Sequence, residues 1–491
     1  MNVFDYLFDE SRSLNKDFVL GPDETLTYKK VYQDSLKFAS FLRRTIGENQ
    51  NVVIASHNSV FFITAYLGVI KSGNICVPID PSLELENFNF ILNSTECQCV
   101  VYSDRFDKII QDSVVNRICE SRLEEILTDS KSEIVNFGKN FDHNRVAEIL
   151  YTSGSTGVPK GVMISHMNVI SNTCSIVKYL KLGSSDVMGV VLPFHYCYGL
   201  SLLHTHLKVG GSIVLINNFI FLSTVIKNLN KFKCTGFAGV PSHFQILLKK
   251  SKTFKQTRFP HLRYVTQAGG KLHNNFIVEF ITNFPRINFF VMYGQTEATA
   301  RLSYLPPDKL KEKMGSIGKS IPDVFLKVLD EDGKAVKNGQ LGEIVAKGDN
   351  IMLGYHKDTE GTKSVLKNGW LYTGDLGRID EEGYIFLESR KKEIIKVGGK
   401  RVSPKEIEEV ILSVPEVIDC TIKGVCDELL GEAIKAHIVL NKDCEKKQMK
   451  KIILRKCHDN LQIHKIPQII SFEKLMRVSS TGKKIKSHSV L

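Results

Sequence analysis

Residues 151–162 read YTSGSTGVPKGV, and this stretch decides how the rest of the chain is interpreted. It holds three glycines, four serine or threonine hydroxyls and one lysine, Lys160. The preceding segment, residues 147–150, is short and mostly apolar, as expected for a buried strand. Glycine lets a backbone turn sharply, and successive amides in such a turn form an anion-binding concavity. The stretch therefore predicts a strand followed by a phosphate-binding loop, with Lys160 adding a positive charge.

Other interpretations of this loop are also open. Segments rich in Gly and Ser are common in solvated surface loops, and the Walker spacing G-x-x-x-x-G-K-[ST] does not occur in this stretch. As a whole string, residues 151–162 closely resemble the phosphate-binding signature of the adenylate-forming superfamily. That superfamily includes acyl-CoA synthetases, aryl-CoA ligases, luciferases and peptide-synthetase adenylation domains. By this resemblance, the residues that contact the phosphates of ATP would be Thr152, Ser153, Gly154, Ser155, Thr156, Gly157 and Lys160.

The composition fits an ordinary globular enzyme. With 491 residues the chain exceeds a single hydrophobic core, so at least two domains are expected. It is 43% hydrophobic and 24% charged. The first ten residues lack the pattern of a signal peptide, and the apolar run at residues 60–70 is too short to span a bilayer. We therefore expect a cytoplasmic protein without a transmembrane segment.

The cysteines indicate the redox state of the thiols, and the net charge indicates which classes of partner the protein could bind. The 11 cysteines include no CxxC pair, which indicates reduced thiols placed mostly in the core. The net charge of +12 is densest near the C-terminus. It is explained either by a solvated basic face or by attraction for coenzyme A or an acidic acyl carrier protein. Because the basic residues are not interleaved with aromatic ones, we do not expect a nucleic acid partner.

The order of elements predicts an α/β fold. Apolar runs alternate with helical patterns up to about residue 144, which indicates a parallel, doubly wound sheet. Residues 317–348 read as antiparallel strands with turns at 332–333, 338–339 and 341–342. Residues 403–406, SPKE, predict a helix that starts with a capping box.

The resemblance adds the domain organisation. It implies a large N-terminal domain, residues 1–389, built from doubly wound mixed sheets and a small β-barrel-like subdomain. A hinge at residues 390–392, centred on Lys392, would connect it to a small mobile α+β domain, residues 393–491.

Two further loops follow apolar strands. Residues 262–266 lead into AGGK at 268–271, and residues 287–292 lead into YGQTEAT at 293–299. Because ligands of open α/β sheets bind at the carboxyl ends of strands, these loops and residues 151–162 are expected to build one nucleotide pocket. In the second loop, Tyr293 offers a flat face for a purine, Thr296 a hydroxyl for phosphate, and Glu297 a hard ligand for Mg²⁺.

The resemblance assigns the remaining nucleotide and catalytic residues. Gly269, Gly270, Lys271 and Gly294 would line the nucleotide site. Asp375 would accept both ribose hydroxyls, and Arg390 would contact the ribose. Lys483, in SSTGKK, would act on the reacting carboxylate and the α-phosphate. Gly398 and Gly399 would line a tunnel for the coenzyme A thiol, with Lys396 nearby.

Residues 192–211, LPFHYCYGLSLLHTHLKVGG, hold three histidines and a cysteine. Their spacing matches no common zinc pattern, so we interpret them as core or pocket wall. By resemblance the segment lines the acyl pocket, and His195 and Tyr196 occupy the positions where Phe and His are usual. The expected substrate pocket consists of His195, Tyr196, Gly199, Val240 and Gly294.

The expected reaction joins a carboxylic acid to AMP from ATP with release of pyrophosphate, and then transfers the acyl group to coenzyme A. The alternative is an acyl- or aminoacyl-AMP ligase that loads a discrete carrier protein. Amino-acid-activating relatives usually place Phe-Asp in the pocket motif, whereas Phe194 and His195 offer no carboxylate for an ammonium group. Neither the acid nor the oligomeric state is predicted.

A substitution at Lys483 tests the role that the resemblance assigns to it. Lys483→Ala is expected to lose acyl-adenylate formation, because the charge beside the two reacting anions is gone. It should retain thioester formation from supplied acyl-AMP. The two half-reactions are assayed separately, and equal loss of both would refute the assigned role.

Overall fold

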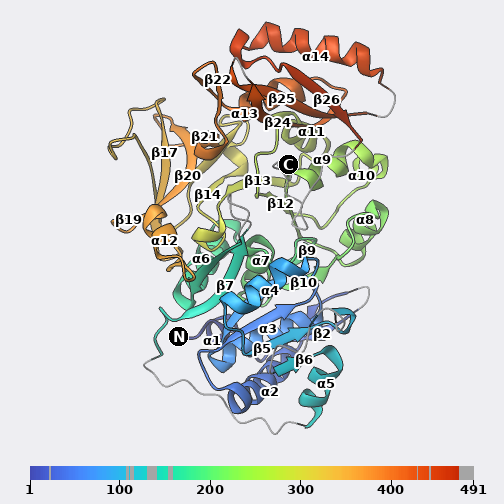
Figure 1. Ribbon diagram of the computed structural model, residues 1–491. Coiled ribbons are helices and arrows are strands. Elements are labelled where there is room, and N and C mark those ends of the chain that lie inside the picture. Colours follow the sequence, from blue (N-terminus) through green and yellow to red (C-terminus); the bar gives the residue numbers. More distant parts are fainter. Residues whose placement is uncertain are drawn as a thin grey trace.

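The computed structural model describes residues 1–21, 24–106, 110, 116–129, 141–152, 159–427, 430–441 and 444–474. In these residues the strands form sheets of seven, fourteen and five strands (Figure 1). The expected α/β fold class, with a large N-terminal domain of mixed sheets and a smaller C-terminal domain, is confirmed. The helices are α1 (Val3–Leu7), α2 (Tyr28–Ile46), α3 (Val60–Ser72), α4 (Leu85–Ser94), α5 (Glu120–Asp129), α6 (His166–Leu180), α7 (Cys197–Lys208), α8 (Leu222–Lys231), α9 (Pro241–Lys250), α10 (Lys252–Gln256), α11 (Asn274–Asn283), α12 (Thr359–Val365), α13 (Pro404–Leu412) and α14 (Lys446–Asn460).

The seven-stranded sheet has helices on both faces. Its order is β18 (Gly354–Tyr355), β8 (Lys160–Ser165), β7 (Val146–Thr152), β4 (Ile75–Ile79), β3 (Asn51–Ala55), β5 (Cys99–Tyr102) and β6 (Asn116–Ile118). On β3, Val52 and Ile54 join a core with α2 and α3, whereas Val53 and Ala55 join another with α4. This alternation is the period of two that a strand imposes. The predicted parallel, doubly wound start of the chain is therefore present.

The fourteen-stranded sheet has a parallel middle part and antiparallel pairings at both ends. Its order is β16 (Val324–Leu329), β17 (Leu341–Gly348), β20 (Trp370–Ile379), β21 (Ile385–Arg390), β15 (Ser316–Ser320), β14 (Ser303–Leu305), β13 (Asn288–Tyr293), β12 (Tyr264–Gln267), β11 (Gly236–Gly239), β9 (Val187–Val190), β10 (Ser212–Leu215), β1 (Asp17–Val19) and β2 (Leu26–Thr27), with β19 (Leu366–Lys367) beside β20. From β1 to β13 the strands pair in parallel, and from β13 to β16 they pair antiparallel.

The antiparallel end of this sheet corresponds to the expected β-barrel-like subdomain. Within the described residues it stays an open sheet, since no pairing joins β16 to β15. Gly333 and Gly339 have positive φ of 79°, as the predicted turns there require. The expected turn at 341–342 is wrong, because these residues begin β17. Gly342 serves close strand approach instead: a Cβ there would lie 2.4 Å from the Leu329 oxygen.

The C-terminal strands form a separate sheet with its own core. The order is β23 (Lys400–Val402), β22 (Ile395–Val397), β25 (Gly431–Leu440) and β24 (Val417–Asp427), with β26 (Ile469–Glu473) beside β25. The apolar core of this part lies within residues 395–466 and packs against α13 and α14. This separate core supports the predicted boundary at residues 390–392, which stays a prediction.

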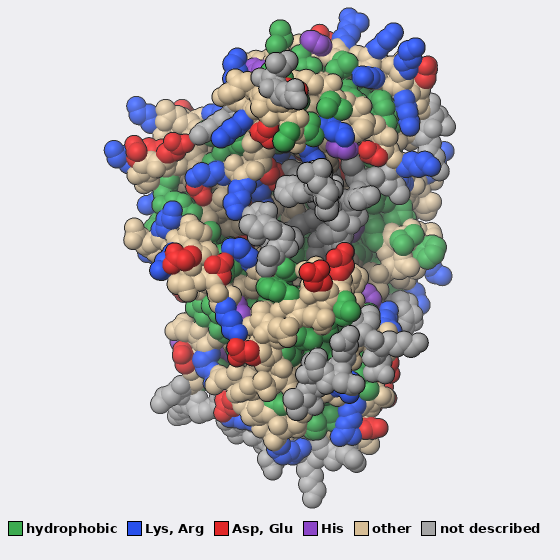
Figure 2. All heavy atoms as spheres, in the orientation of Figure 1, with side chains coloured by type: hydrophobic (Ala, Val, Ile, Leu, Met, Phe, Trp, Pro, Cys, Tyr) green, Lys and Arg blue, Asp and Glu red, His purple; other side chains and the backbone are tan. Residues whose placement is uncertain are grey.

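Helix α13 starts where the sequence predicts, with Pro404 in its first turn. The predicted capping box is wrong, because the Ser403 side chain makes no capping hydrogen bond. Its hydroxyl donates instead to the Glu388 oxygen at 2.9 Å, which ties the start of α13 to β21. Helix α14 lies at the top of Figure 1, and Figure 2 shows Lys and Arg side chains gathered over it.

All 11 cysteines are free thiols, and six of them are buried. Burial raises the pKa of the Cys97 thiol to about 11 and that of the Cys457 thiol to about 11. Cys426, on β24, is exposed. The thiols are therefore distributed as the composition predicts, mostly in the core.

A buried polar network joins β7, α3 and α7. The Tyr66 hydroxyl donates to Glu148 Oε2 at 3.0 Å and lies 2.7 Å from His204 Nε2. The His204 tautomer sets which of the two groups donates in the second contact. Burial lowers the pKa of His204 to about 3 and raises the pKa of Glu148 from 4.5 to about 7.

This network makes stability depend on pH. Between about pH 4.5 and 7 the unfolded chain loses the Glu148 proton and the folded chain keeps it. The contribution of Glu148 to the free energy of unfolding should therefore fall by about 1.4 kcal/mol per pH unit and level off above pH 7, opposed below about pH 6.5 by the rise that the neutral His204 contributes. Glu148→Gln should remove this decline, as urea unfolding at several pH values measures. Glu360→Gln, at an exposed acid, should follow the wild type, and a Glu148→Gln profile parallel to the wild type would contradict the assignment.

Candidate nucleotide-binding site

The two loops that follow β12 and β13 come from neighbouring strands. These strands pair in parallel, with Gln267 opposite Val291, so both loops leave the same edge of the sheet. The hairpin of β7 and β8 belongs to the other sheet, where Thr152 pairs with Lys160. The site is therefore assembled from two sheets, and side-chain contacts must join them.

At one end of the site, Tyr293, Asp375 and Arg390 form a single cluster. The Tyr293 hydroxyl donates to Asp375 Oδ2 at 2.7 Å, and Arg390 Nε donates to Asp375 Oδ1 at 3.1 Å. Asp375 is only 2% exposed. These bonds join the end of β13 to β20 and β21. A carboxylate fixed in this way fits the predicted role of accepting ribose hydroxyls.

The AGGK loop lies against the start of α9. Gly269 has a φ of +82°, which glycine adopts without strain. Gln267 Nε2 donates to the Gly270 oxygen at 2.7 Å. A Cβ on Gly270 would lie 3.3 Å from Pro241 Cγ. The loop is thus packed closely against α9 at Gly270.

Glu297 is held through both its backbone and its carboxylate. Met352 N–H donates to the Glu297 carbonyl at 2.9 Å, and the Tyr355 hydroxyl donates to Glu297 Oε1 at 2.9 Å. Within the described ranges, no set of three His, Cys, Asp or Glu side chains could hold a metal ion. A magnesium ion at Glu297 would therefore take its other ligands from phosphate and water, as this ion commonly does. The single hard oxygen ligand fits that arrangement.

Lys160 faces the same region. Its Nζ lies 2.8 Å from Asp358 Oδ2 and 4.7 Å from the centre of the Tyr355 ring. Thr152, opposite Lys160 in the hairpin, donates through its hydroxyl to the Lys160 oxygen at 3.5 Å. The remaining predicted phosphate contacts, Ser153, Gly154, Ser155, Thr156 and Gly157, lie outside the described residues. Lys483 lies outside them as well.

Thr296 connects the nucleotide loop to the expected acyl pocket. Its hydroxyl donates to Cys197 Sγ at 3.6 Å, at the start of α7. In that helix a Cβ on Gly199 would lie 2.1 Å from the Pro193 oxygen, so only glycine fits. Tyr196 is partly buried just before α7, and Val240 is fully buried just before α9.

His195 occupies a polar corner beside this pocket. Its Nε2 lies 3.9 Å from Asp80 Oδ2 and makes no hydrogen bond to the described residues. Burial lowers the pKa of His195 to about 4, so the imidazole is neutral at pH 7. His204 and His206 are buried within α7, which agrees with their interpretation as core residues.

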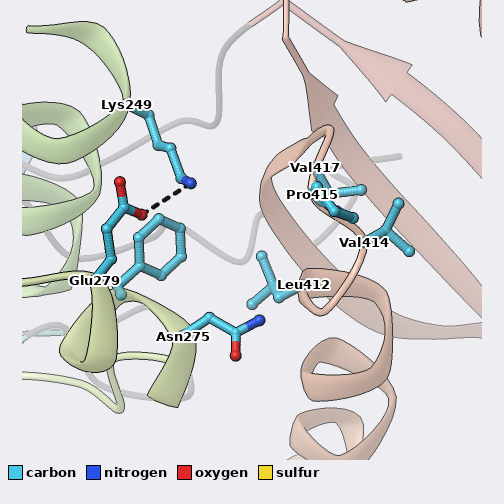
Figure 3. A pocket seen from close by; sticks show the side chains of 8 residues that line it. Lys249, Asn275, Glu279, Leu412, Val414, Pro415 and Val417 are labelled. Atoms are coloured by element: carbon cyan, nitrogen blue, oxygen red, sulfur yellow. Dashed lines mark ion pairs between the residues drawn. The ribbon is translucent and has the colours of Figure 1, made fainter. Parts of the chain in front are cut away.

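The C-terminal domain contacts the nucleotide loop through α13. Lys271 forms an ion pair with Glu409, and His273 Nε2 lies 3.0 Å from the Glu409 oxygen. One turn earlier, Lys405 faces the ribose corner: burial lowers its pKa, while Asp375 acts to raise it. Figure 3 shows the next part of this interface, where Leu412 and Pro415 face Asn275 on α11.

The residues predicted for the thiol-transfer step lie in the C-terminal domain. Lys396, Gly398 and Gly399 are exposed in the hairpin of β22 and β23. Gly398 N–H donates to the Leu430 oxygen at 2.9 Å, within the C-terminal domain. Lys392, the predicted hinge, is exposed in a short turn between β21 and β22. Their predicted roles stay predictions.

Sequence reasoning missed Tyr355, Asp358, Lys405 and Glu409. Asp358 could have been found as a helix start, because its side chain caps α12 by accepting from Gly361 N–H at 2.7 Å. Tyr355 gives no local signal, since its contacts with Lys160 and Glu297 cross large sequence separations.

Known proteins share this sequence and fold. The chain matches the family AMP-binding enzyme over residues 9–356 and the AMP-binding enzyme C-terminal domain over residues 406–483. A long-chain-fatty-acid–CoA ligase of Escherichia coli O6:H1 is 27% identical and covers 97% of this chain and 92% of that protein. An oxalate–CoA ligase of Arabidopsis thaliana is 27% identical and covers 93% and 91%. ATP-bound MatB from Rhodopseudomonas palustris superposes with a TM-score of 0.89 at 25% identity, covering 99% and 97%.

The fold, the site and these matches define an adenylate-forming enzyme of the acyl-CoA synthetase type, as the sequence predicts. The chain belongs to the AMP-binding enzyme family. Among the described residues, no helix combines the length and the apolar character needed to cross a membrane.

Gly294 provides a test of the loop geometry. A Cβ there would lie 2.0 Å from the Ala300 oxygen, which is backbone and cannot move aside cheaply. Gly294→Ala should lower the free energy of unfolding by about 1–3 kcal/mol and weaken ATP binding. Urea unfolding and equilibrium dialysis with ATP measure the two effects. Gly183→Ala, where a Cβ meets open space, is the matched control; equal behaviour of the two variants would show the loop to be tolerant.

Proposed function

We propose that this protein activates a carboxylic acid with ATP and magnesium to an acyl-adenylate, and then transfers the acyl group to the thiol of coenzyme A. The observation that carries the proposal is the arrangement of one loop, residues 293–297. Its tyrosine is bonded to Asp375, and its glutamate has a carboxylate held for a hard cation. The expected adenosine contact, Tyr293, and the expected magnesium ligand, Glu297, therefore lie at the two ends of the same five residues.

In the first step, an oxygen of the substrate carboxylate attacks the α-phosphorus of ATP, and the bond to pyrophosphate breaks. Both reactants are anions, so the protein must position them and offset their charge. Asp375 and Arg390 would hold the ribose, and Lys160 would contact the leaving phosphates. Magnesium at Glu297 would neutralise phosphate charge. Lys483 would approach the reacting carboxylate.

In the second step, the coenzyme A thiolate attacks the acyl carbon and AMP leaves. We propose that the C-terminal domain turns about Lys392 for this step. The turn would break the contacts of Lys271 and His273 with Glu409 and bring Gly398 and Gly399 to the site. Such a movement separates the two half-reactions and keeps water from the adenylate.

The acid itself is left open by the relatives. A long-chain-fatty-acid–CoA ligase and an oxalate–CoA ligase are equally identical to this chain, at 27%. Their names describe a long apolar acid and a small dicarboxylate, so identity does not choose between them. The neutral His195, with an unbonded Nε2, favours an acid that carries a hydrogen-bonding group near the pocket entrance.

Loading of an acyl carrier protein is the alternative. It is favoured by the exposed basic side chains of α14, which Figure 2 shows at the top of the molecule. They are Lys446, Lys447, Lys450, Lys451, Arg455 and Lys456. Carrier proteins of this kind are acidic, so such a face would attract one electrostatically.

A cytoplasmic location of the protein stays part of the proposal.

Pyrophosphate exchange into ATP tests the proposed activity. The wild type should catalyse exchange that depends on a carboxylic acid, in a panel running from oxalate to long-chain fatty acids. Asp375→Ala should lose at least 100-fold of the activity, because the ribose loses its acceptor, whereas Asp332→Ala, at an exposed turn, should not change it. Adding coenzyme A or an acyl carrier protein then identifies the acceptor. Exchange with no acid of the panel would overturn the proposal.

A further inference from the structure

The segment from Met352 to Asp358 bridges the two sheets at the nucleotide site. Leu353 N–H donates to the Met163 oxygen at 2.9 Å, and His356 N–H donates to the Gly161 oxygen at 2.7 Å, so the segment runs along β8. At its start, Met352 N–H donates to the Glu297 carbonyl. One short segment thus contacts both the strand after the phosphate loop and the loop that carries the expected magnesium ligand.

Within this segment, Tyr355 lies between two residues of opposite charge. Its ring faces the Lys160 ammonium at 4.7 Å, and its hydroxyl donates to Glu297 Oε1 at 2.9 Å. Tyr355 is 8% exposed, so the bond to Glu297 is largely shielded from water. Its own amide donates to Thr362 Oγ1 at 2.8 Å, which fixes the backbone beneath the ring.

The hydrogen bond determines which carboxylate oxygen stays available. Oε1 accepts the Tyr355 proton, and Oε2 makes no hydrogen bond within the described part of the chain. A tyrosine hydroxyl is protonated at neutral pH, so Tyr355 is the donor and the carboxylate is the acceptor. A protonated, buried donor orients a carboxylate in the way that partners behind a metal ligand generally do.

We propose that Tyr355 is a positioning residue for the metal: its hydroxyl holds Glu297 by Oε1 and leaves Oε2 available to a magnesium ion that binds with ATP. Asp358 positions the cation, Lys160, in a corresponding way. Its Oδ2 holds Lys160 at 2.8 Å, so the lysine lies over the ring face of Tyr355 and the glutamate at its hydroxyl, and no ion pair joins the two within the described residues. The inference rests on the proposed function, since it requires ATP and magnesium at this site.

The positioning role of Tyr355 is tested without turnover by equilibrium dialysis with labelled ATP in the absence of any carboxylic acid. Each protein is measured in magnesium and in EDTA, and the ratio of the two ATP affinities reports the contribution of the metal. Tyr355→Phe keeps the ring under Lys160 and removes only the hydroxyl. It should reduce this ratio by about tenfold, the usual effect of losing a partner behind a metal ligand, and leave the affinity in EDTA unchanged.

Two control variants separate positioning from structure. Asp358→Asn acts on Lys160, so it should change both affinities by the same factor and leave the ratio unaltered. Tyr304→Phe removes a hydroxyl from a tyrosine that stacks on Tyr179, and should change neither affinity. In a Glu297→Gln background, Tyr355→Phe should have no further effect on the ratio, because the carboxylate that it orients is gone.

The outcomes are distinguishable. A Tyr355→Phe ratio equal to that of the wild type, or a loss of the same size in EDTA, would overturn the positioning role and leave the proposed function standing. A persistent effect of Tyr355→Phe in the Glu297→Gln background would overturn it too. A wild type that binds no ATP in magnesium would overturn the proposed function itself.

Discussion

The hydrogen bond between Tyr293 and Asp375 fixes the geometry on which the nucleotide site depends. Both side chains are buried, and the bond joins the last parallel strand of the large sheet to its antiparallel end. A carboxylate that is 2% exposed is costly unless it is paired, and Tyr293 and Arg390 supply its partners. Since β13 and β20 are separated by other strands, this bond connects parts of the sheet that do not pair directly.

A second set of contacts brings in the other sheet. The segment around Tyr355 pairs with β8 and reaches Glu297, so the hairpin that carries Lys160 is positioned against the loop after β13. Cation and carboxylate are both needed near a triphosphate, yet free side chains of opposite charge would pair with each other. Asp358 is the ion-pair partner of Lys160, and the Tyr355 hydroxyl is the hydrogen-bond partner of Glu297. The site is therefore arranged for its charges before a nucleotide arrives, which is what electrostatic preorganisation requires.

Local patterns in the sequence predicted the elements well, and the contacts between distant elements poorly. The strand expected at residues 147–150 lies within β7, and the apolar runs at 262–266 and 287–292 overlap β12 and β13, because buried apolar runs are local signals. Ser403 was misassigned, since its hydroxyl finds the Glu388 oxygen on another strand before it can cap α13. Gly342 was misassigned as a turn because the close approach of Leu329, which requires glycine, is not visible locally. The predicted site residues Tyr293, Glu297 and Asp375 come from family motifs, whereas the contact of Tyr355 with Glu297 depends on a pairing across 58 residues.

The distribution of cysteines has a practical consequence for following domain movement. Six of the 11 thiols are buried, whereas Cys426 lies exposed on β24 of the C-terminal domain. A thiol-directed fluorophore would therefore report preferentially from that domain without any engineered attachment point. The indole of Trp370, the single tryptophan of the chain, sits on β20 of the large domain and offers a natural energy-transfer partner. Energy transfer between Trp370 and a label on Cys426 would therefore report the distance between the two domains.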